Sequence, residues 1–289
     1  MNQFENYKIL QKLGTGIHGT IFKVKDMLSD KIYALKLIHD EKTNEFDTVV
    51  KLNKLCDTTL KYYKINDAKN AILMDYIEGD DLFNICETEM FKYDIFNLEY
   101  CNSIMKDNKF ITYIAKLIDA IKLLHDNNFV HRDIKIENIM ITKDDNLFLI
   151  DFYTLLYIDK NYEGVNANGT LEYMSPEILN LYIEGNTVPP EYFKPSDIWA
   201  LGIVIFTLVY ISYPFFNCNP KTDIIRYLSF MQQEKIMKFE KIPFLSKLVN
   251  SMLNFDYKKR PTIDEVKTDF QILCLENSFK IDSKYVELR

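Results

Sequence analysis

Residues 131–138 read HRDIKIEN, and the apolar stretches NNFV and IMI flank them. Four formal charges, those of Arg132, Asp133, Lys135 and Glu137, therefore stand within eight positions, between stretches that are suited to burial. Burying a charge is unfavourable unless the charge is paired. The segment therefore raises the question of which ligand these charges meet.

Composition narrows the answer. The chain has 289 residues, of which 47% are hydrophobic and 27% charged, a balance typical of a soluble globular protein. This length permits a large core and a single domain with two lobes. The net charge of -7, without any block of Lys and Arg, argues against nucleic-acid binding through a broad basic face.

Cysteine usage and hydropathy point to an intracellular protein, cytoplasmic or nuclear. The five cysteines (Cys56, Cys86, Cys101, Cys218 and Cys274) are scattered, without a Cys-x-x-Cys pair, so neither a disulfide framework nor a zinc site is indicated. The N-terminus lacks the pattern of a signal peptide. The apolar run from Trp199 is short for a membrane span and lacks basic flanks, so we expect a buried core helix and no membrane partner.

The hydrophobic pattern predicts an α+β fold with a small β-rich lobe and a larger, mainly helical lobe. Short β-type runs occur at 7–13, 20–25, 31–38 and 71–77. Apolar residues at helical spacing (Phe46, Val49, Leu52 and Leu55) predict one helix among them. After 78–82 the pattern turns helical, most clearly at 111–128 and in the Trp199 run.

The stretch LGTGIHGTIFKV, residues 13–24, contains Gly14, Gly16 and Gly19. A dinucleotide-binding site would open a helix here, whereas two strands follow, and the Gly-Lys-Ser/Thr of a P-loop is absent. A glycine loop between two strands lets backbone N–H groups approach phosphate oxygens. Lys36, in a strand seventeen residues after Gly19, needs an anion if it points into the lobe.

Taken together, these features resemble the eukaryotic-type protein kinases of the serine/threonine subclass, over residues 7–262. The order of a glycine loop, a strand lysine, HRD-x-K-x-x-N and then Asp-Phe at 151–152 is highly specific. The resemblance implies a bilobed protein-kinase fold in one domain over 1–289, with an N-lobe at 1–74, a hinge at 75–79 and a C-lobe at 80–289. It also implies transfer of the γ-phosphate of ATP to Ser and Thr hydroxyls of protein substrates.

The resemblance assigns roles to the charged residues. Asp133 would accept or orient the substrate hydroxyl, and Lys135 would face the γ-phosphate. Asn138 and Asp151 would hold Mg²⁺, with Mn²⁺ as an alternative ion. The residues implied at the ATP site are Leu13, Gly14, Thr15, Gly16, Ile17, His18, Gly19, Ile21, Ala34, Lys36, Glu45, Asp75, Ile77, Asp81 and Met140, with Met74 at the entrance.

The second lobe carries further matching segments. GTLEYMSPE, residues 169–177, resembles the segment that seats a peptide substrate, and Thr170 with Lys135 is typical of the serine/threonine subclass. Glu177 is expected to pair with Arg260 in a buried ion pair, and Asp197 to cap the catalytic-loop backbone. Asp81 and Glu137 favour basic protein substrates. The sequence carries no indication of oligomeric state.

The sequence departs from the family pattern at Tyr153, which takes the place of a glycine after Asp-Phe. A Cβ there narrows the allowed backbone angles. The family's glutamate that pairs with the strand lysine is also missing from its usual position, because alignment places Thr48 there. Glu45 lies one turn earlier on the same face and is favoured over Asp47.

Two alternatives to an active protein kinase stay open. Tyr153 and the displaced glutamate favour a pseudokinase scaffold that binds nucleotide and partners, whereas the intact charged set favours catalysis. A kinase of small metabolites is disfavoured by GTLEYMSPE. The segment that usually carries an activating phosphate for Arg132 reads VNAN, with Asn166 and no Ser or Thr, which predicts an active state that does not depend on phosphorylation there.

Overall fold

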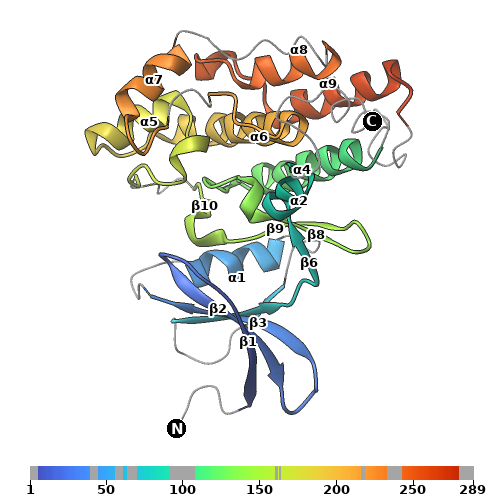
Figure 1. The fold of residues 1–289 in the computed structure, drawn as a ribbon. Helices are drawn as coiled ribbons and strands as arrows, with labels where there is room; N and C mark the ends of the chain where they lie inside the picture. Colours follow the sequence, from blue (N-terminus) through green and yellow to red (C-terminus); the bar gives the residue numbers. More distant parts are fainter. Residues whose placement is uncertain are drawn as a thin grey trace. The chain divides into compact units, whose positions relative to one another are not determined.

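The structure, a computed structural model, describes residues 6–39, 45–55, 61–63, 70–90, 108–159, 162, 164–215, 219–232 and 243–279. The chain folds as two compact units. One unit comprises Met1–Asp80 and Met140–Leu155, and the other comprises Asp81–Ile139 and Leu156–Arg289. The predicted α+β class is confirmed, with the sheet in the first unit and the long helices in the second (Figure 1).

An antiparallel sheet of five strands, in the order β1-β2-β3-β5-β4, forms the first unit. The four runs predicted as strands each form one, whereas β4 was not predicted because it is only two residues long. The strands are β1 (Tyr7–Thr15), β2 (Gly19–Asp26), β3 (Ile32–Ile38), β4 (Tyr62–Tyr63) and β5 (Ala71–Asp75).

Because side chains alternate along the strands, the two faces of this sheet carry different residues. One face buries a core of Val24, Leu35, Ala71 and Leu73, against which aromatic side chains pack. Residues one position away point to the opposite face, because successive side chains of a strand alternate. Register pairs Ile21 with Lys36 and Ala34 with Met74, so these four residues share that second face.

The helix predicted from apolar spacing is α1 (Glu45–Leu55), which contacts β4 and η2 (Phe152–Thr154). Its buried apolar residues, Val49 and Leu52, belong to the predicted apolar set. The remaining part of the unit is the hairpin of β8 (Ile139–Thr142) and β9 (Leu147–Leu149), which joins β6 (Gly79–Asp81) in a three-stranded sheet. Local sequence patterns do not reveal that 140–155 groups with the N-terminal strands.

Amphipathic helices pack around α6 (Phe193–Tyr210) in the second unit. Helix α4 packs against α6 and α9, and α8 packs against the same two helices, as Figure 1 shows. The long helices are α2 (Leu82–Met90), α4 (Asn108–Asp126), α5 (Pro176–Glu184), α7 (Ile224–Gln232), α8 (Pro243–Met252) and α9 (Ile263–Glu276). The short elements are β7 (Phe129–Val130), η1 (Ile136–Asn138), β10 (Leu156–Tyr157), η3 (Leu171–Tyr173), η4 (Pro190–Tyr192) and η5 (Tyr257–Lys259).

From Ile198 to Tyr210 every residue of α6 except Thr207 is apolar. The segment Pro190–Tyr210 is long and apolar enough to cross a membrane by length and composition alone. Within the structure 78% of its apolar window is buried, which agrees with a core helix. The helix ends at Tyr210, before the Ser-Tyr-Pro that the apolar run includes, because Ile211 adopts a left-handed conformation with φ 51°. Cys86 and Cys274 are buried and form no disulfide, while Cys56, Cys101 and Cys218 lie outside the described residues.

The predicted ion pair between Glu177 and Arg260 is confirmed, and both side chains are almost fully buried. Arg260 Nη1 and Nη2 donate to the two carboxylate oxygens of Glu177 at 2.6 and 2.7 Å. The Arg260 side chain is 0% exposed, donates from Nε to the carbonyl of Asn254, and stacks its guanidinium over Trp199 at 4.9 Å. Because the geometry is bidentate and the other donors are satisfied, the pair can offset its desolvation.

Removing one partner of this pair leaves the other charge buried and uncompensated. We expect Glu177→Ala to lower the free energy of unfolding by about 3–5 kcal/mol, measured by urea denaturation. Glu177→Leu combined with Arg260→Met should recover part of the loss, because apolar side chains of similar volume need no partner. Lys259→Ala, in an exposed neighbour, is the control. A loss below about 1 kcal/mol in Glu177→Ala would contradict this account.

Candidate functional site

A buried lysine lies between two carboxylates in the first unit. Lys36, 4% exposed on β3, donates from Nζ to Glu45 Oε1 at 2.7 Å and to Asp151 Oδ1 at 2.8 Å. Burial acts to lower the pKa of Lys36, but the charges of the two carboxylates outweigh it and raise the pKa above its ordinary value. The lysine therefore stays a cation, and its predicted pairing with Glu45 in place of Thr48 is confirmed.

The second carboxylate of this cluster, Asp151, follows strand β9 and adopts a left-handed conformation with φ 57°. Its side chain keeps 34% exposure, whereas that of Glu45 keeps 3%. Asp151 thus has an open side on which a further ligand can bind. Phe152, the next residue, is buried beside Tyr62 at 5.8 Å between ring centroids.

The glycine loop between β1 and β2 is open where a ligand would approach it. A Cβ added to Gly14 or Gly16 would meet no atom within 4 Å. At Gly19 a Cβ would lie 2.6 Å from the carbonyl oxygen of Leu37, so this glycine is required by the close approach of β3. Thr15 and Ile17 of the same loop are exposed, and Thr15 Oγ1 lies 3.4 Å from Thr20 Oγ1.

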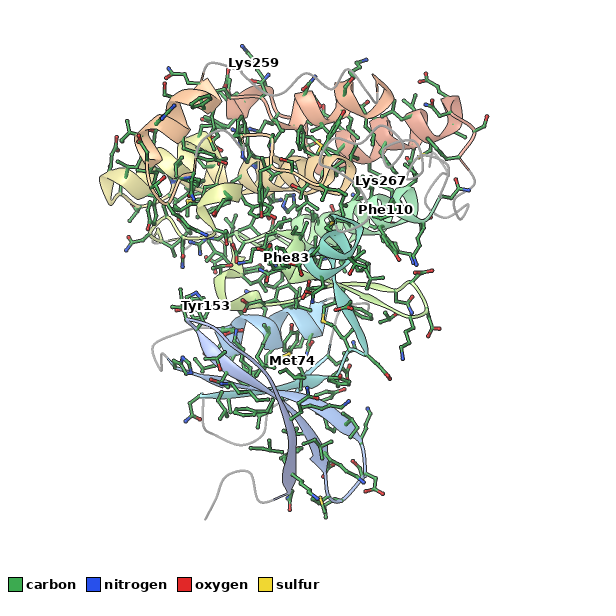
Figure 2. All side chains as sticks on the ribbon, viewed as in Figure 1. Met74, Phe83, Phe110, Tyr153, Lys259 and Lys267 are labelled. Atoms are coloured by element: carbon green, nitrogen blue, oxygen red, sulfur yellow. The ribbon has the colours of Figure 1, made fainter. Side chains whose placement is uncertain are left out.

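Apolar residues predicted to enclose a flat ligand lie in the first unit. Ile21, Ala34 and Met74 share the sheet face that carries Lys36, as the strand register requires. Figure 2 labels Met74 on β5. The other predicted members of this unit are Leu13 near the end of β1, Asp75 at the end of β5, Ile77 after it, and Met140 on β8. Ile21, Met74 and Met140 are only partly buried, so apolar surface is left for a ligand.

Asp81, which was predicted near the same ligand, belongs to the second unit. It precedes α2, where its Oδ1 accepts the backbone N–H of Asn84 at 2.8 Å and its Oδ2 accepts the side-chain amide of Asn84 at 3.1 Å. These bonds satisfy free donors at the start of a helix. Asp81 therefore has a structural role at α2.

In the second unit, Asp133 is held by three neighbours. Its Oδ1 accepts from Thr170 Oγ1 at 2.7 Å and from the backbone N–H of Thr170 at 3.0 Å. Lys135 Nζ lies 2.9 Å from Asp133 Oδ2 and donates to Thr170 Oγ1 at 2.9 Å. Gly169 permits this approach, because its φ is 132° and a Cβ there would lie 2.7 Å from the carbonyl oxygen of Arg132. The carboxylate is thus fixed beside a cation.

Asn138 faces the same carboxylate from η1. Its amide nitrogen donates to the backbone carbonyl of Asp133 at 2.9 Å and to Asp133 Oδ2 at 3.1 Å. Because the nitrogen faces Asp133, the amide oxygen is turned away from it. Carboxylate and amide oxygens such as those of Asp151 and Asn138 are the donors that Mg²⁺ accepts.

The described ranges contain no group of three or more His, Cys, Asp or Glu side chains that could hold a metal ion by themselves. This does not conflict with a magnesium site, because Mg²⁺ is usually bound through one or two carboxylates together with water and substrate phosphates. Asp151 in the first unit and Asn138 in the second are each a side chain of the kind that this mode uses.

The predicted cap of the catalytic-loop backbone by Asp197 is confirmed. Asp197 Oδ2 accepts the N–H of His131 at 2.9 Å, and Oδ1 accepts the N–H of Arg132 at 2.9 Å. His125 Nε2 lies 3.0 Å from Oδ2. Burial acts to raise the pKa of Asp197, but the hydrogen bond and charge of His125, aided by His131 and the N–H of Arg132, lower it below its ordinary value.

Several contacts at the site were not predicted. Tyr62 is buried near Glu45 and Asp151, and burial, with their charges, raises the pKa of its hydroxyl well above 10. His125 supports Asp197, and the His18 ring stacks on that of Tyr153. Each contact joins segments far apart in the sequence, and no local motif marks them.

Comparisons with known proteins agree with this geometry. The sequence matches the protein kinase domain model over residues 7–270. It is similar to serine/threonine-protein kinases PSK2 and PSK1 of Saccharomyces cerevisiae, with 30% and 31% identity over 93% of this chain and over 24% and 19% of those proteins. A probable serine/threonine-protein kinase of Dictyostelium discoideum is 29% identical over 89% of this chain and 53% of that protein. The chain therefore spans about a fifth to a half of the length of these relatives.

The contribution of Asp197 to stability should depend on pH. Asp197→Asn removes one of two anionic acceptors, so we expect a loss of about 1.5–3 kcal/mol in the free energy of unfolding at pH 7. Because the folded-state pKa is lowered, the stabilisation is present above the unfolded pKa of about 3.9 and is lost as pH falls through the folded value.

Denaturation of the native chain and of Asp197→Asn between pH 7 and pH 3 measures this effect. The difference between the two should shrink below a pH of about 4. Asp269→Asn, an exposed change on α9, should show no such trend. A difference in unfolding free energy that stays constant from pH 7 to pH 3 would contradict a lowered pKa of Asp197.

Proposed function

Because the chain belongs to the protein kinase domain family, we propose that it transfers the γ-phosphate of ATP to Ser and Thr hydroxyls of protein substrates. The observation that carries the proposal is the environment of Asp133, a carboxylate fixed by Thr170, Lys135 and Asn138. In this family such an aspartate meets the substrate hydroxyl. The placing of Thr170 against both Asp133 and Lys135 supports the serine/threonine subclass.

On the hydroxyl side, the Asp133 carboxylate orients the substrate hydroxyl and takes its proton as the bond from that oxygen to the γ-phosphorus forms. The bond from the γ-phosphorus to the oxygen that bridges to the β-phosphate breaks, and ADP leaves with that oxygen. A carboxylate has about four acceptor positions, and Thr170 Oγ1, the Thr170 N–H, Lys135 and Asn138 occupy all four, so the substrate hydroxyl takes the place of one of these donors. The Lys135 ammonium, 2.9 Å from Asp133, neutralises negative charge near the transferred group.

On the phosphate side, Lys36 is the cation that the first unit provides. The buried Glu45 carboxylate holds the Lys36 ammonium in one position, whereas the second partner of Lys36, Asp151, is more exposed. The open surroundings of Gly14 and Gly16 leave space for phosphate oxygens beside the backbone of the glycine loop. Mg²⁺, or Mn²⁺ in its place, would be held by Asp151 and Asn138 and would supply charge neutralisation on the phosphates.

The proposal that the substrates are basic is supported by two carboxylate oxygens in the second unit. Among the described residues, Oε2 of Glu137 and Oε2 of Glu172 are buried without a hydrogen-bond partner. Burial raises the pKa of Tyr213, and the charges of both glutamates add to that rise, which places them near one hydroxyl. Burial likewise raises the pKa of Glu137, with contributions from the charges of Asp133 and Asp81. Lys221 Nζ lies 2.9 Å from Oε1 of Glu172, so a basic side chain of a substrate would act as a further cation beside the two glutamates.

We further propose that both units form one kinase domain, which acts on intracellular proteins. The family match covers parts of both units, and each unit holds part of the charged set that phosphoryl transfer requires.

A peptide panel tests the function. With ATP and Mg²⁺, the native chain should phosphorylate Ser and Thr peptides, those with basic residues before the target most rapidly, and Asp133→Asn should abolish detectable transfer. Asp269→Asn, the exposed control, should retain full activity. ATP binding without any transfer would favour the scaffold alternative, and equal rates on basic and acidic peptides would contradict the substrate preference.

The glutamate assignment gives a matched pair of variants on α1. Glu45→Ala leaves the buried Lys36 with one carboxylate, so we expect kcat/KM for ATP to fall roughly 10- to 150-fold, the equivalent of a charged hydrogen bond. Thr48→Ala, one turn along the same helix, should change it less than about threefold. Equal losses of kcat/KM in both variants would contradict the role of Glu45 as the partner of Lys36.

The contacts of Arg132 favour an active state without phosphorylation. Its Nη2 donates to the backbone carbonyl of Asn166 at 2.9 Å, and its guanidinium lies 5.4 Å from the centroid of the Phe193 ring. Backbone pairing of Asn166 with Thr187 ties this segment further. Phosphatase treatment should therefore leave activity unchanged. Phosphate found by mass spectrometry at Thr154, Tyr157 or Tyr162, with activity lost on its removal, would contradict this.

A further inference from the structure

The ring of Tyr153 lies face to face with the imidazole of His18. Their centroids are 3.5 Å apart, and the planes make an angle of 13°. His18 stands at the tip of the hairpin between β1 and β2, and Tyr153 lies in η2, two residues after Asp151. Figure 2 labels Tyr153 beside this hairpin tip. The contact thus joins the glycine loop to the segment that carries Asp151.

Around this contact the loop tip is open. Gly14 and Gly16 have empty space on their Cβ side, and Ile17 is 89% exposed. His18, in contrast, is partly buried. The backbone bonds from Gly16 N–H to Gly19 and from His39 N–H to His18 hold the base of the turn. The stack between the two rings is therefore placed to decide where the tip lies.

The interaction free energy of such a stack is suited to a contact that opens and closes. Aromatic pairs change an equilibrium by about 2- to 12-fold, which corresponds to roughly 0.5–1.5 kcal/mol. That is enough to bias a loop toward one position without locking it. The Lys36 ammonium lies 5.7 Å from the centroid of the Tyr153 ring, within cation–π range, so the ring also adjoins the buried lysine.

We propose that His18 and Tyr153 form an aromatic clasp that holds the glycine loop closed on the Asp151 segment and limits the rate at which nucleotide enters and leaves. Both are positioning residues, and the nucleotide part of the proposal rests on the proposed function. Tyr153 stands where a glycine is usual in the family, and a glycine has no side chain with which to reach the loop. The clasp gives this substitution a role other than loss of activity.

Hydrogen exchange of the nucleotide-free chain tests the clasp without any assay of activity. Amides of residues 14–19 should exchange about 2- to 12-fold faster in His18→Ala and in Tyr153→Ala than in the native chain. The double variant should be no faster than either single one, because both remove the same contact. Tyr153→Phe keeps the ring and should stay protected, as should Ile17→Ala, the neighbouring control. Additive effects, or equal loss of protection in Ile17→Ala, would overturn the clasp.

Stopped-flow binding of a fluorescent ADP analogue tests the gate. Association and dissociation rates should rise together, by the same about 2- to 12-fold, in His18→Ala and Tyr153→Ala, with a smaller change in equilibrium affinity. Tyr153→Phe should retain the native rates. Unchanged rates in the alanine variants would overturn the gate. Absence of any nucleotide binding by the native chain would overturn both the gate and the proposed function, while hydrogen exchange would still decide whether the clasp exists.

Discussion

The geometry of the catalytic loop depends on one buried carboxylate, that of Asp197. The loop bends at Arg132, whose left-handed φ of 70° is unusual for a residue with a side chain. Such a conformation costs on the order of 1–3 kcal/mol and persists only when its surroundings enforce it. Asp197 enforces it by accepting two successive backbone N–H groups, and α6 holds Asp197 in place because this helix is buried from Asp197 to Tyr210. The position of Asp133, one residue further, follows from this bend.

Paired charges organise both units in the same way. In the first unit the buried Lys36 has two carboxylate partners, one more buried than the other, and in the second unit Asp133 has a lysine and a threonine. Pairing of this kind holds the charged side chains in one orientation. Such an arrangement is suited to a ligand with several negative charges, because the protein groups need little reorganisation when that ligand binds. Phosphoryl transfer relies mainly on this kind of preorganisation.

Sequence analysis predicted the parts of the molecule that local patterns encode. The predicted strands and the α1 helix follow from alternation and apolar spacing. The pairs Lys36–Glu45 and Glu177–Arg260 were implied by the family resemblance, and helix geometry selected Glu45. Local patterns could not show that 140–155 groups with the N-terminal sheet, because this grouping arises from packing between distant segments. The stack of His18 on Tyr153 is of the same kind. From the sequence alone, a tyrosine at a glycine position is only a departure from the family pattern. The structure shows that its ring contacts His18.

The central claim is that the charges of this chain are arranged for a triphosphate with magnesium. Calorimetric titration with a non-hydrolysable ATP analogue, with and without Mg²⁺, tests it most directly in the native chain and in Asp151→Asn. The account predicts that Mg²⁺ strengthens binding to the native chain and that this dependence is lost in the variant, since Asp151 is the more exposed carboxylate beside Lys36. Absence of binding, or an affinity that does not change with Mg²⁺ in the native chain, would contradict the claim.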